Sequence, residues 1–291
     1  MKSRILDSIK TKSFIPFPDK CFYNMDESDN ILRKFGNKTL SELKNESYST
    51  WKFSGHDTYK EYVKNLKKIK DWYYKDNSVT YTLNSFGYRT KQFDEVDWAN
   101  SIVIFGCSLV VGIGVDDKHT ISSFLEKEIG IPIINMGIAG GSNMMHIHNS
   151  NVLFETYPTP KAVIYSWSPL PRYFRYSWNH INLYGNWSED QRDFKKNQYD
   201  CMIRNVVSMH TMKNIWKNKT VLIDYSTDCV LFDFIKNLSP DPDRYFIDIL
   251  GSSKRKFPDD FARDLSHYSK DHNYKVAKKL AAILRSHMIQ K

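Results

Sequence analysis

Long apolar runs and cysteines are both scarce in this sequence. No segment has the roughly 20 consecutive apolar residues that a membrane-spanning helix needs, and the opening Met1–Asp7 lacks the apolar core of a secretory signal. The four cysteines show neither the CxxC spacing of structural zinc sites nor the density of disulfide-stapled domains. We therefore expect a cytoplasmic or virion-associated protein with no membrane segment, no structural metal and no disulfide framework.

The composition is that of a folded chain. Its 291 residues, 41% hydrophobic and 14% aromatic, suffice for one large core and a small extra domain. The net charge of +9 suggests an anionic partner, but the lysines are spread along the chain rather than gathered in one stripe. Their densest cluster, residues 60–75, has apolar residues at helical spacing and is typical of an amphipathic helix with a solvated basic face. The sequence thus does not favour nucleic acid as a partner.

The chain divides into two regions. Residues 1–80 predict an N-terminal extension of loops and short helices, packed on the main domain because its many aromatic residues would otherwise be exposed. In residues 81–291, apolar β-branched runs alternate with helical patterns, which predicts an α/β domain with a parallel sheet covered on both faces. Strands are predicted at 102–106, 132–136, 162–166, 220–225 and 245–249, and helices near 119–129, 142–155, 188–217 and 273–284.

Candidate site residues follow the predicted strands. Ser108 comes after the first strand, Gly140 after the second, Ser168 after the third, and Asp264–His267 after the last. Sites in such sheets form beyond the carboxyl ends of the strands, so we expect these residues to lie close together. A serine hydroxyl attacks an ester only when an imidazole takes its proton and a carboxylate orients that imidazole. Ser108, His267 and Asp264 are therefore the predicted nucleophile, base and orienting acid.

Three short blocks resemble the SGNH, or GDSL-like, hydrolase superfamily: Phe105–Val115, Asn135–Asn143 and Ala262–His267. The resemblance implies a three-layer α/β/α fold, with Ser108 as nucleophile and the Gly140 N–H in the oxyanion hole. It also implies a serine esterase or deacylase without a cofactor, acting on a small-molecule or glycan ester, with an O-acetyl group on a carbohydrate-like substrate as the first expectation.

Two positions depart from that family's pattern. Cys107 stands where an acidic residue usually precedes the nucleophile, a variant that resembles the Gly-Cys-Ser subgroup of phage and viral members. The third block, Val163–Pro169, lacks the Asn whose side chain completes the oxyanion hole. Asn143 or Ser168 is predicted to donate instead. Without either, turnover would fall by about 10²–10³-fold.

Several of these residues also have simpler interpretations. Ser108 alone could cap a helix, which is a common role for a serine after a strand. His272 competes with His267 as the base. His146 and His148 are spaced like a metal pair on a strand, but the surrounding residues predict a helix, where positions two apart face different ways, so we expect no metal site.

The segment 166–187 is rich in aromatic residues and directly follows the third predicted strand. Trp167, Arg172 and Tyr173 are predicted to form a wall of the active site there. Aromatic faces stack on sugar rings, and arginines pair with carboxylates or phosphates, so a glycan-like substrate fits this composition. A lid packed on the N-terminal extension would have the same composition.

Three functions remain compatible with the sequence. The first is the serine esterase or deacylase. The second is an acyltransferase that uses the same triad and passes the acyl group to a sugar hydroxyl when water is excluded. The third is a catalytically weak glycan-binding or virion-structural module, which the missing Asn and the basic, aromatic composition favour. The sequence does not indicate an oligomeric state.

Overall fold

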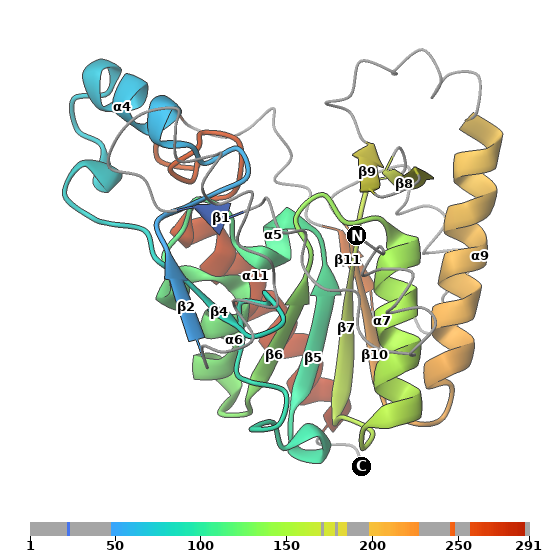
Figure 1. The fold of residues 1–291 in the computed structure, drawn as a ribbon. Coiled ribbons are helices and arrows are strands. Elements are labelled where there is room, and N and C mark those ends of the chain that lie inside the picture. The colour runs from blue at the N-terminus through green and yellow to red at the C-terminus, as the bar shows by residue number, and fades with distance from the viewer. Residues whose placement is uncertain are drawn as a thin grey trace.

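The computed structural model describes residues 48–169, 172–177, 180–184, 198–226 and 257–288, together with short strands at 22–23 and 245–247. At its centre lies a five-stranded sheet in the order β11-β10-β7-β5-β6, in which every neighbouring pair is parallel. The predicted parallel sheet is confirmed (Figure 1). Its strands are β5 (Ile102–Gly106), β6 (Ile133–Gly137), β7 (Ala162–Trp167), β10 (Val221–Ser226) and β11 (Tyr245–Ile247).

Helices cover both faces of this sheet. The helices α7 (Asn143–Thr156) and α9 (Gln198–Trp216) lie on one face, and α6 (Ile121–Ile129) and α11 (Lys270–Met288) lie on the other (Figure 1). The three-layer α/β/α fold is therefore confirmed. The terminal helix is longer than its prediction over 273–284, and residues 188–197 of the predicted helix 188–217 fall outside the described residues.

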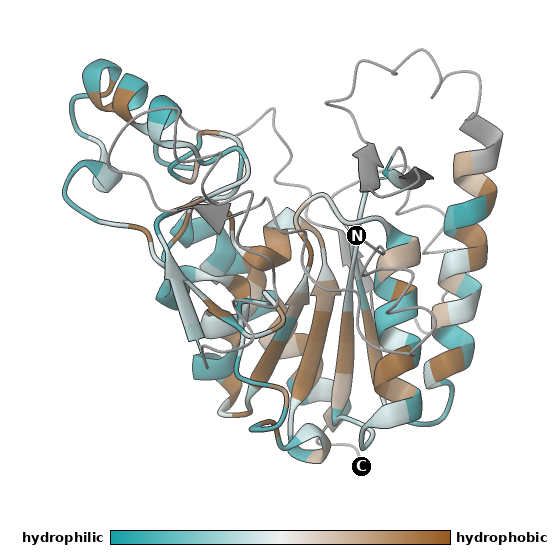
Figure 2. Ribbon diagram, viewed as in Figure 1, coloured by the Kyte–Doolittle hydropathy of each residue, from teal (hydrophilic) through white to brown (hydrophobic). Residues whose placement is uncertain are grey.

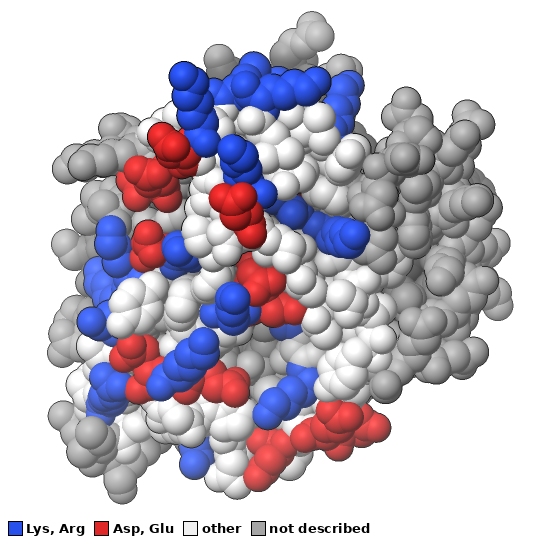
Figure 3. Space-filling view, turned by 90° about the vertical axis from the view of Figure 1, so that its left-hand side faces the viewer, with Lys and Arg blue, Asp and Glu red and all other residues white. Residues whose placement is uncertain are grey.

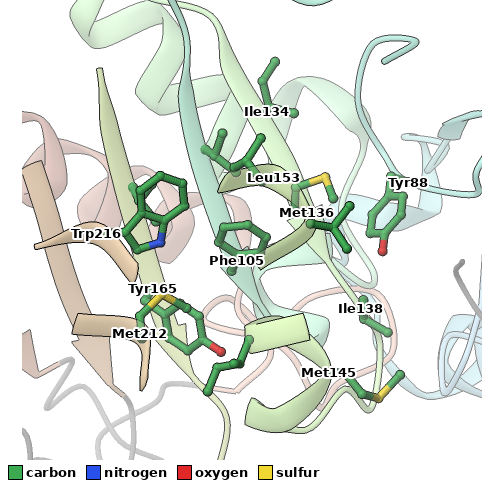
Figure 4. Close-up of a cluster of buried hydrophobic side chains, with 14 of the residues drawn as sticks. Tyr88, Phe105, Ile134, Met136, Ile138, Met145, Leu153, Tyr165, Met212 and Trp216 are labelled. Atoms are coloured by element: carbon green, nitrogen blue, oxygen red, sulfur yellow. The ribbon is translucent and has the colours of Figure 1, made fainter. Parts of the chain in front are cut away.

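Side chains along each strand point alternately to the two faces of the sheet and so contribute to two separate cores. On β5, Val103 and Phe105 pack with residues of α7 and α9, whereas Ile102 and Ile104 pack with residues of α6 and α11. Figure 4 shows the first of these cores, with Trp216 and Met212 of α9 beside Tyr165 of β7. Strand β5 is apolar along its length, as expected for a parallel strand buried on both faces (Figure 2). Burying each large apolar side chain stabilises the fold by about 1.5–3 kcal/mol.

The described part of the N-terminal region contains strands as well as a helix. Strand β2 (Tyr48–Trp51) pairs antiparallel with β4 (Tyr81–Asn84), and β1 (Phe22–Tyr23) pairs with β3 (Phe53–Ser54). The prediction of loops and short helices missed these strands, because segments of two to four residues are too short to show an alternating pattern. The predicted helix at 60–75 is α4 (Tyr59–Lys68), which is followed by a 3₁₀ turn, η1 (Tyr73–Lys75).

A third core joins this region to the main sheet. Trp51, Trp72 and Tyr81 pack together with Val111 and Ile113, which belong to the segment that leaves β5. The residues before position 81 therefore hold the segment that follows Ser108. The boundary between an extension (1–80) and a domain (81–291) stays a prediction.

The remaining described elements are short. They are α5 (Ser108–Val111), the 3₁₀ turns η2 (Trp98–Asn100) and η3 (Asp117–His119), and an antiparallel hairpin of β8 (Tyr173–Ser177) and β9 (His180–Tyr184). The hairpin stands beyond the carboxyl ends of the parallel strands (Figure 1).

Charges of both signs are mixed on the face that carries α4. Lys and Arg gather along its upper edge, and below that edge they alternate with Asp and Glu (Figure 3). One pair on α4 itself is the salt bridge from Lys64 to Glu61, at 2.8 Å. Among the helices that the structure describes, none has the length and apolar character to cross a bilayer.

Candidate active site

The strand order places a topological switch point between β5 and β7. From β5 the chain passes to β6 on one side of it, and then to β7 on the other side. The connecting helices α6 and α7 consequently lie on opposite faces, which opens a crevice beyond the carboxyl ends of these two strands. Ser108 follows β5 and Ser168 follows β7, so both residues lie at the position where such sheets bind ligands.

Close strand packing positions Ser108. A Cβ atom at Gly106 would lie 2.7 Å from the Ser166 Cβ on β7 and 2.5 Å from Val110 Cγ2, so the turn after β5 has no room for a side chain there. Ser108 is the first residue of α5 and is 7% exposed. The helix ends at Gly112, whose φ of 77° suits glycine and whose N–H donates to the Ser108 carbonyl at 3.0 Å.

Asp264 and His267 form a compact pair. His267 Nδ1 lies 2.5 Å from Asp264 Oδ2, and the backbone N–H groups of Ser266 and His267 each donate to Asp264 Oδ1 at 3.1 Å. Burial alone would raise the pKa of Asp264. The charge and hydrogen bonds of His267, with the N–H of Ser266, outweigh it and hold that pKa below its ordinary value. An ionised Asp264 thus fixes the ring through Nδ1 and leaves Nε2 for proton transfer.

The loop that carries this pair touches the segment that follows Ser108. Arg263 N donates to the Gly114 carbonyl at 3.0 Å, and a Cβ at Gly114 would lie 3.2 Å from Asp264 Oδ1. Within the described residues, no hydrogen bond joins Ser108 to His267, so their direct contact stays a prediction. Such contacts are often long until substrate binds.

His272, the competing base, lies elsewhere. It is buried in the first turn of α11, with its ring 3.8 Å from the Tyr268 ring between centroids. The carboxylate of Asp264 contacts His267 instead.

Gly140 follows strand β6, which pairs with the strand that leads to Ser108. Gly106 on β5 pairs with Gly137 on β6, and the N–H of Ile138 donates to the Gly106 carbonyl at 2.8 Å. The segments that leave the two strands therefore start side by side. Gly140, with a φ of 71°, turns the chain towards α7.

The two predicted substitute donors are occupied within the protein. Asn143 Nδ2 donates to the Ser168 carbonyl at 3.1 Å and to Asn205 Oδ1 at 2.5 Å, and Asn143 Oδ1 accepts from the Ser168 N–H at 2.8 Å. The Ser168 hydroxyl is fully buried, 3.3 Å from His146 Nε2. The structure therefore does not support either side chain as an oxyanion donor, because these contacts tie the start of α7 to the end of β7 and to α9.

Cys107 and Arg172 form a contact that sequence reasoning missed. Burial raises the pKa of the Cys107 thiol, but the charge and hydrogen bond of Arg172, with contacts from the Leu109 N–H and the Ser108 hydroxyl, bring it below its ordinary value. The sequence offered no signal for this, because Arg172 is 65 positions away and reaches Cys107 only after β7 has paired with β5.

The predicted aromatic wall is only partly where it was expected. Arg172 and Tyr173 line a cavity of about 330 Å³. Trp167 belongs to the core instead: it is 1% exposed, and its Nε1 donates to Asp224 at 2.9 Å. The prediction for Trp167 was wrong, because it is the last residue of β7 and points into the layer below α7 and α9. Within the aromatic segment 166–187, positions 170–171, 178–179 and 185–187 lie outside the described residues.

The two histidines considered as a metal pair lie on α7, as the helical pattern predicted. His146 is buried against Tyr165, whereas His148 is half-buried. In the part of the chain that the structure describes, no three His, Cys, Asp or Glu residues are grouped in a way that could hold a metal ion.

No family model and no curated protein matches the sequence. Solved structures to which it is similar include lipases and esterases. The lipase Lip_vut3 from a goat rumen metagenome is 10% identical, with a TM-score of 0.42 over 64% of this chain and 97% of that one. The acetyl xylan esterase Est2A from Butyrivibrio proteoclasticus is also 10% identical, with a TM-score of 0.44 over 66% of this chain and 65% of that one. The SGNH-hydrolase family esterase AlinE4 is 16% identical, with a TM-score of 0.30 over 45% of this chain and 60% of that one.

One of these structures, AlinE4, is named as a member of the SGNH-hydrolase family that the three sequence blocks resemble. The identities are low, and the fold assignment itself depends on the strand order and helix layers described above. The likeness to a Gly-Cys-Ser subgroup and to phage members stays a prediction.

Proposed function

We propose that this protein is a serine esterase or deacylase in which Ser108 attacks the acyl carbon of an ester. The observation that carries the proposal is the Asp264–His267 pair, held by three hydrogen bonds in a loop that contacts the segment leaving Ser108. Each predicted role matches a chemical need: a hydroxyl at a strand end, an imidazole with a second nitrogen available, and a buried carboxylate to orient it.

In this mechanism His267 Nε2 takes the Ser108 proton as the hydroxyl oxygen bonds to the acyl carbon. The negative charge on the ester oxygen is stabilised by the backbone N–H groups of Ser108 and Gly140. The imidazolium then gives its proton to the leaving alcohol, and a covalent acyl-serine forms. Water, activated by the same imidazole, releases the acid and restores the hydroxyl. Asp264 stays ionised and stabilises the imidazolium throughout.

The substrate proposed is an O-acyl group, acetyl first, on a carbohydrate-like alcohol. The sequence blocks favour this class through their SGNH resemblance, and the cavity beside Arg172 and Tyr173 gives a half-buried aromatic ring and a guanidinium for a sugar to contact.

The test compares two serines that flank the same strand. Ser108 follows β5, whereas Ser101 precedes it, buried, with its hydroxyl donating to the Trp98 carbonyl at 2.9 Å. Hydrolysis of 4-nitrophenyl acetate and of an acetylated glucose should fall on the order of 10⁶-fold in Ser108→Ala. Ser101→Ala should keep its turnover. Equal turnover in Ser108→Ala and the parent protein would exclude Ser108 as the nucleophile.

Adding a free sugar to the same assay separates hydrolysis from transfer. Release of acetate regardless of the sugar supports the esterase. Acetylated sugar formed in place of acetate identifies an acyltransferase. An absence of product in every arm with the folded parent protein supports the catalytically weak glycan-binding or virion-structural module.

A further inference from the structure

A cavity of about 330 Å³ lies at the switch point, on the side of α7 and α9. This volume is at the lower end of ligand pockets, which span roughly 300–1,000 Å³. The residues around it come from the start of α7, the first turns of α9 and the segment after β7. Its polar lining includes Ser142, Asn143, Arg172, Tyr173, Arg204 and Asn205.

The described lining of the cavity is basic. Arg172 and Arg204 both line it, and its described lining contains no Asp or Glu. His146 of α7 adds no charge at neutral pH, because burial and the charge of Arg172 lower its pKa to about 3. Asn143 and Asn205 are neutral and bond to each other. The two guanidinium groups are therefore the cationic groups of the described lining.

The start of α7 adds a second feature. Ser142 precedes this 14-residue helix at the N-cap position, yet its hydroxyl makes no capping bond. That hydroxyl is buried, with the residue 2% exposed, and has no hydrogen-bond partner. A serine at this position ordinarily accepts from the helix's own N–H groups, and leaving a buried hydroxyl unpaired costs about 1–3 kcal/mol. A ligand oxygen in the cavity would satisfy both the hydroxyl and the first N–H groups of α7.

Arg172 connects this cavity to the proposed nucleophile. Its side chain hydrogen-bonds Cys107, the residue before Ser108, and also lines the cavity. A group held by Arg172 would therefore contact the same side chain that bonds the residue before the proposed nucleophile.

We infer that this cavity is a subsite for an anionic group, a carboxylate or a phosphate, carried by the ester substrate. Arg172 and Arg204 would pair with its oxygens, the Ser142 hydroxyl would donate to one of them, and the N-terminal end of α7 would stabilise the charge. The inference extends the proposed function, since the anion belongs to the molecule that Ser108 deacylates. The preferred substrates would then be esters of acidic sugars or of sugar phosphates.

Direct binding tests the subsite without relying on catalysis. Glucuronate, inorganic phosphate and glucose are titrated into the full-length protein by calorimetry. Arg204→Gln should weaken binding of the anions about tenfold or more, because a hydrogen bond to a charged group contributes roughly 1.5–3 kcal/mol. Arg285→Gln is the matched control, since it removes the same charge from α11 on the opposite face of the sheet. Binding of glucuronate alone assigns a carboxylate, and binding of phosphate alone assigns a phosphate.

Ser142→Ala is a second test, in which anion binding should weaken without a loss of stability. Because the hydroxyl has no partner in the protein, its removal should leave the thermal midpoint unchanged or raised while anion binding weakens. Absence of anion binding by the parent protein, equal affinity in Arg204→Gln and Arg285→Gln, or undiminished affinity in Ser142→Ala would overturn the subsite.

Kinetics then separates this inference from the proposed function. The ratio of kcat/KM for acetylated glucuronate over acetylated glucose should fall tenfold or more in Arg204→Gln and stay constant in Arg285→Gln. If Ser108→Ala retains activity but the anions still bind through Arg204, the nucleophile assignment fails and the subsite stands. If hydrolysis depends on Ser108 but the kcat/KM ratio is the same in Arg204→Gln and the parent protein, the subsite is excluded and the proposed function stands.

Discussion

Arg263 and Asp57, which are 206 positions apart in the chain, form a buried two-pronged ion pair. Arg263 Nε and Nη2 donate to Asp57 Oδ1 and Oδ2 at 2.9 and 2.7 Å. Burial alone would lower the pKa of Arg263, but the hydrogen bonds and charge of Asp57 raise it, so the guanidinium is charged. Tyr81 donates its hydroxyl to the same carboxylate at 2.5 Å and accepts from the Gly114 N–H at 2.8 Å. The pair therefore fastens the residue before Asp264 to the N-terminal region.

Removing one side of this pair should destabilise the fold strongly. Asp57→Asn keeps the shape of the side chain but leaves the Arg263 charge buried without a counter-charge. We expect the free energy of unfolding in urea to fall by about 3–5 kcal/mol. Glu61→Gln, which breaks the exposed pair with Lys64, serves as the control and should leave the urea midpoint unchanged. An equally small change in both variants would show that the buried pair contributes little.

The carboxylate of Asp264 should make stability depend on pH with a defined sign. His267 and two N–H groups outweigh burial and hold its folded-state pKa below the unfolded value of roughly 4. Its contribution is thus complete above that pH and is lost as pH falls through the lower, folded-state pKa. The difference in unfolding free energy between the parent and Asp264→Asn should stay constant above pH 4 and shrink below it. A difference that persists in acid would contradict the ionised pair. At neutral pH we expect kcat for Asp264→Asn to fall by roughly 10⁴-fold.

Neutral His146 predicts a separate pH effect. Burial and the Arg172 charge lower its folded-state pKa to about 3, whereas an unfolded histidine titrates near pH 6.5. Its contribution is complete above roughly pH 6.5 and declines as acid protonates the unfolded chain, down to the folded-state pKa. His146→Gln should flatten the fall in the urea midpoint between pH 6.5 and the acid limit of folding. The exposed His210 gives a control, because His210→Gln should leave that slope intact.

Much of this fold could be predicted from the sequence, because its strands are largely apolar and regularly spaced. The predicted strand at 162–166 differs from β7 by one residue at its end, and the predicted helix at 142–155 differs from α7 by one residue at each end. Periodicity also placed Ser108 and the Asp264 loop at one edge of the sheet. The supporting contacts were not predictable, since they join residues far apart. Nothing in the local sequence distinguishes buried Arg263 from a solvated arginine, and the pairing of Asn143 with Asn205 depends on how α7 packs on α9.

Replacing Arg89 by lysine should lower both stability and activity. Its guanidinium donates to the carbonyls of Thr80, Val111, Gly112 and Val115 and to Asp117, and so holds the segment that follows Ser108. Lysine keeps the charge but lacks the planar fork, so several carbonyls lose their donor. We expect Arg89→Lys to lower the unfolding free energy by about 2 kcal/mol or more and to reduce kcat. Arg285→Lys on the outer surface is the matched control, and equal stability of the two variants would exclude this role.

Substitution of Asn143 distinguishes a structural role of its side-chain amide from a role in catalysis. Its amide joins Ser168 to Asn205, so Asn143→Ala should remove three hydrogen bonds and lower the unfolding free energy by roughly 1–3 kcal/mol. An oxyanion donor would behave differently: its loss lowers kcat and kcat/KM equally, by about 10²–10³-fold, with little change in stability. We expect the first pattern, with Asn205→Ala reproducing part of the destabilisation because it removes the same contact from α9. A stable Asn143→Ala variant with the large, equal kinetic loss would instead show that the amide turns from Ser168 to the substrate during the reaction.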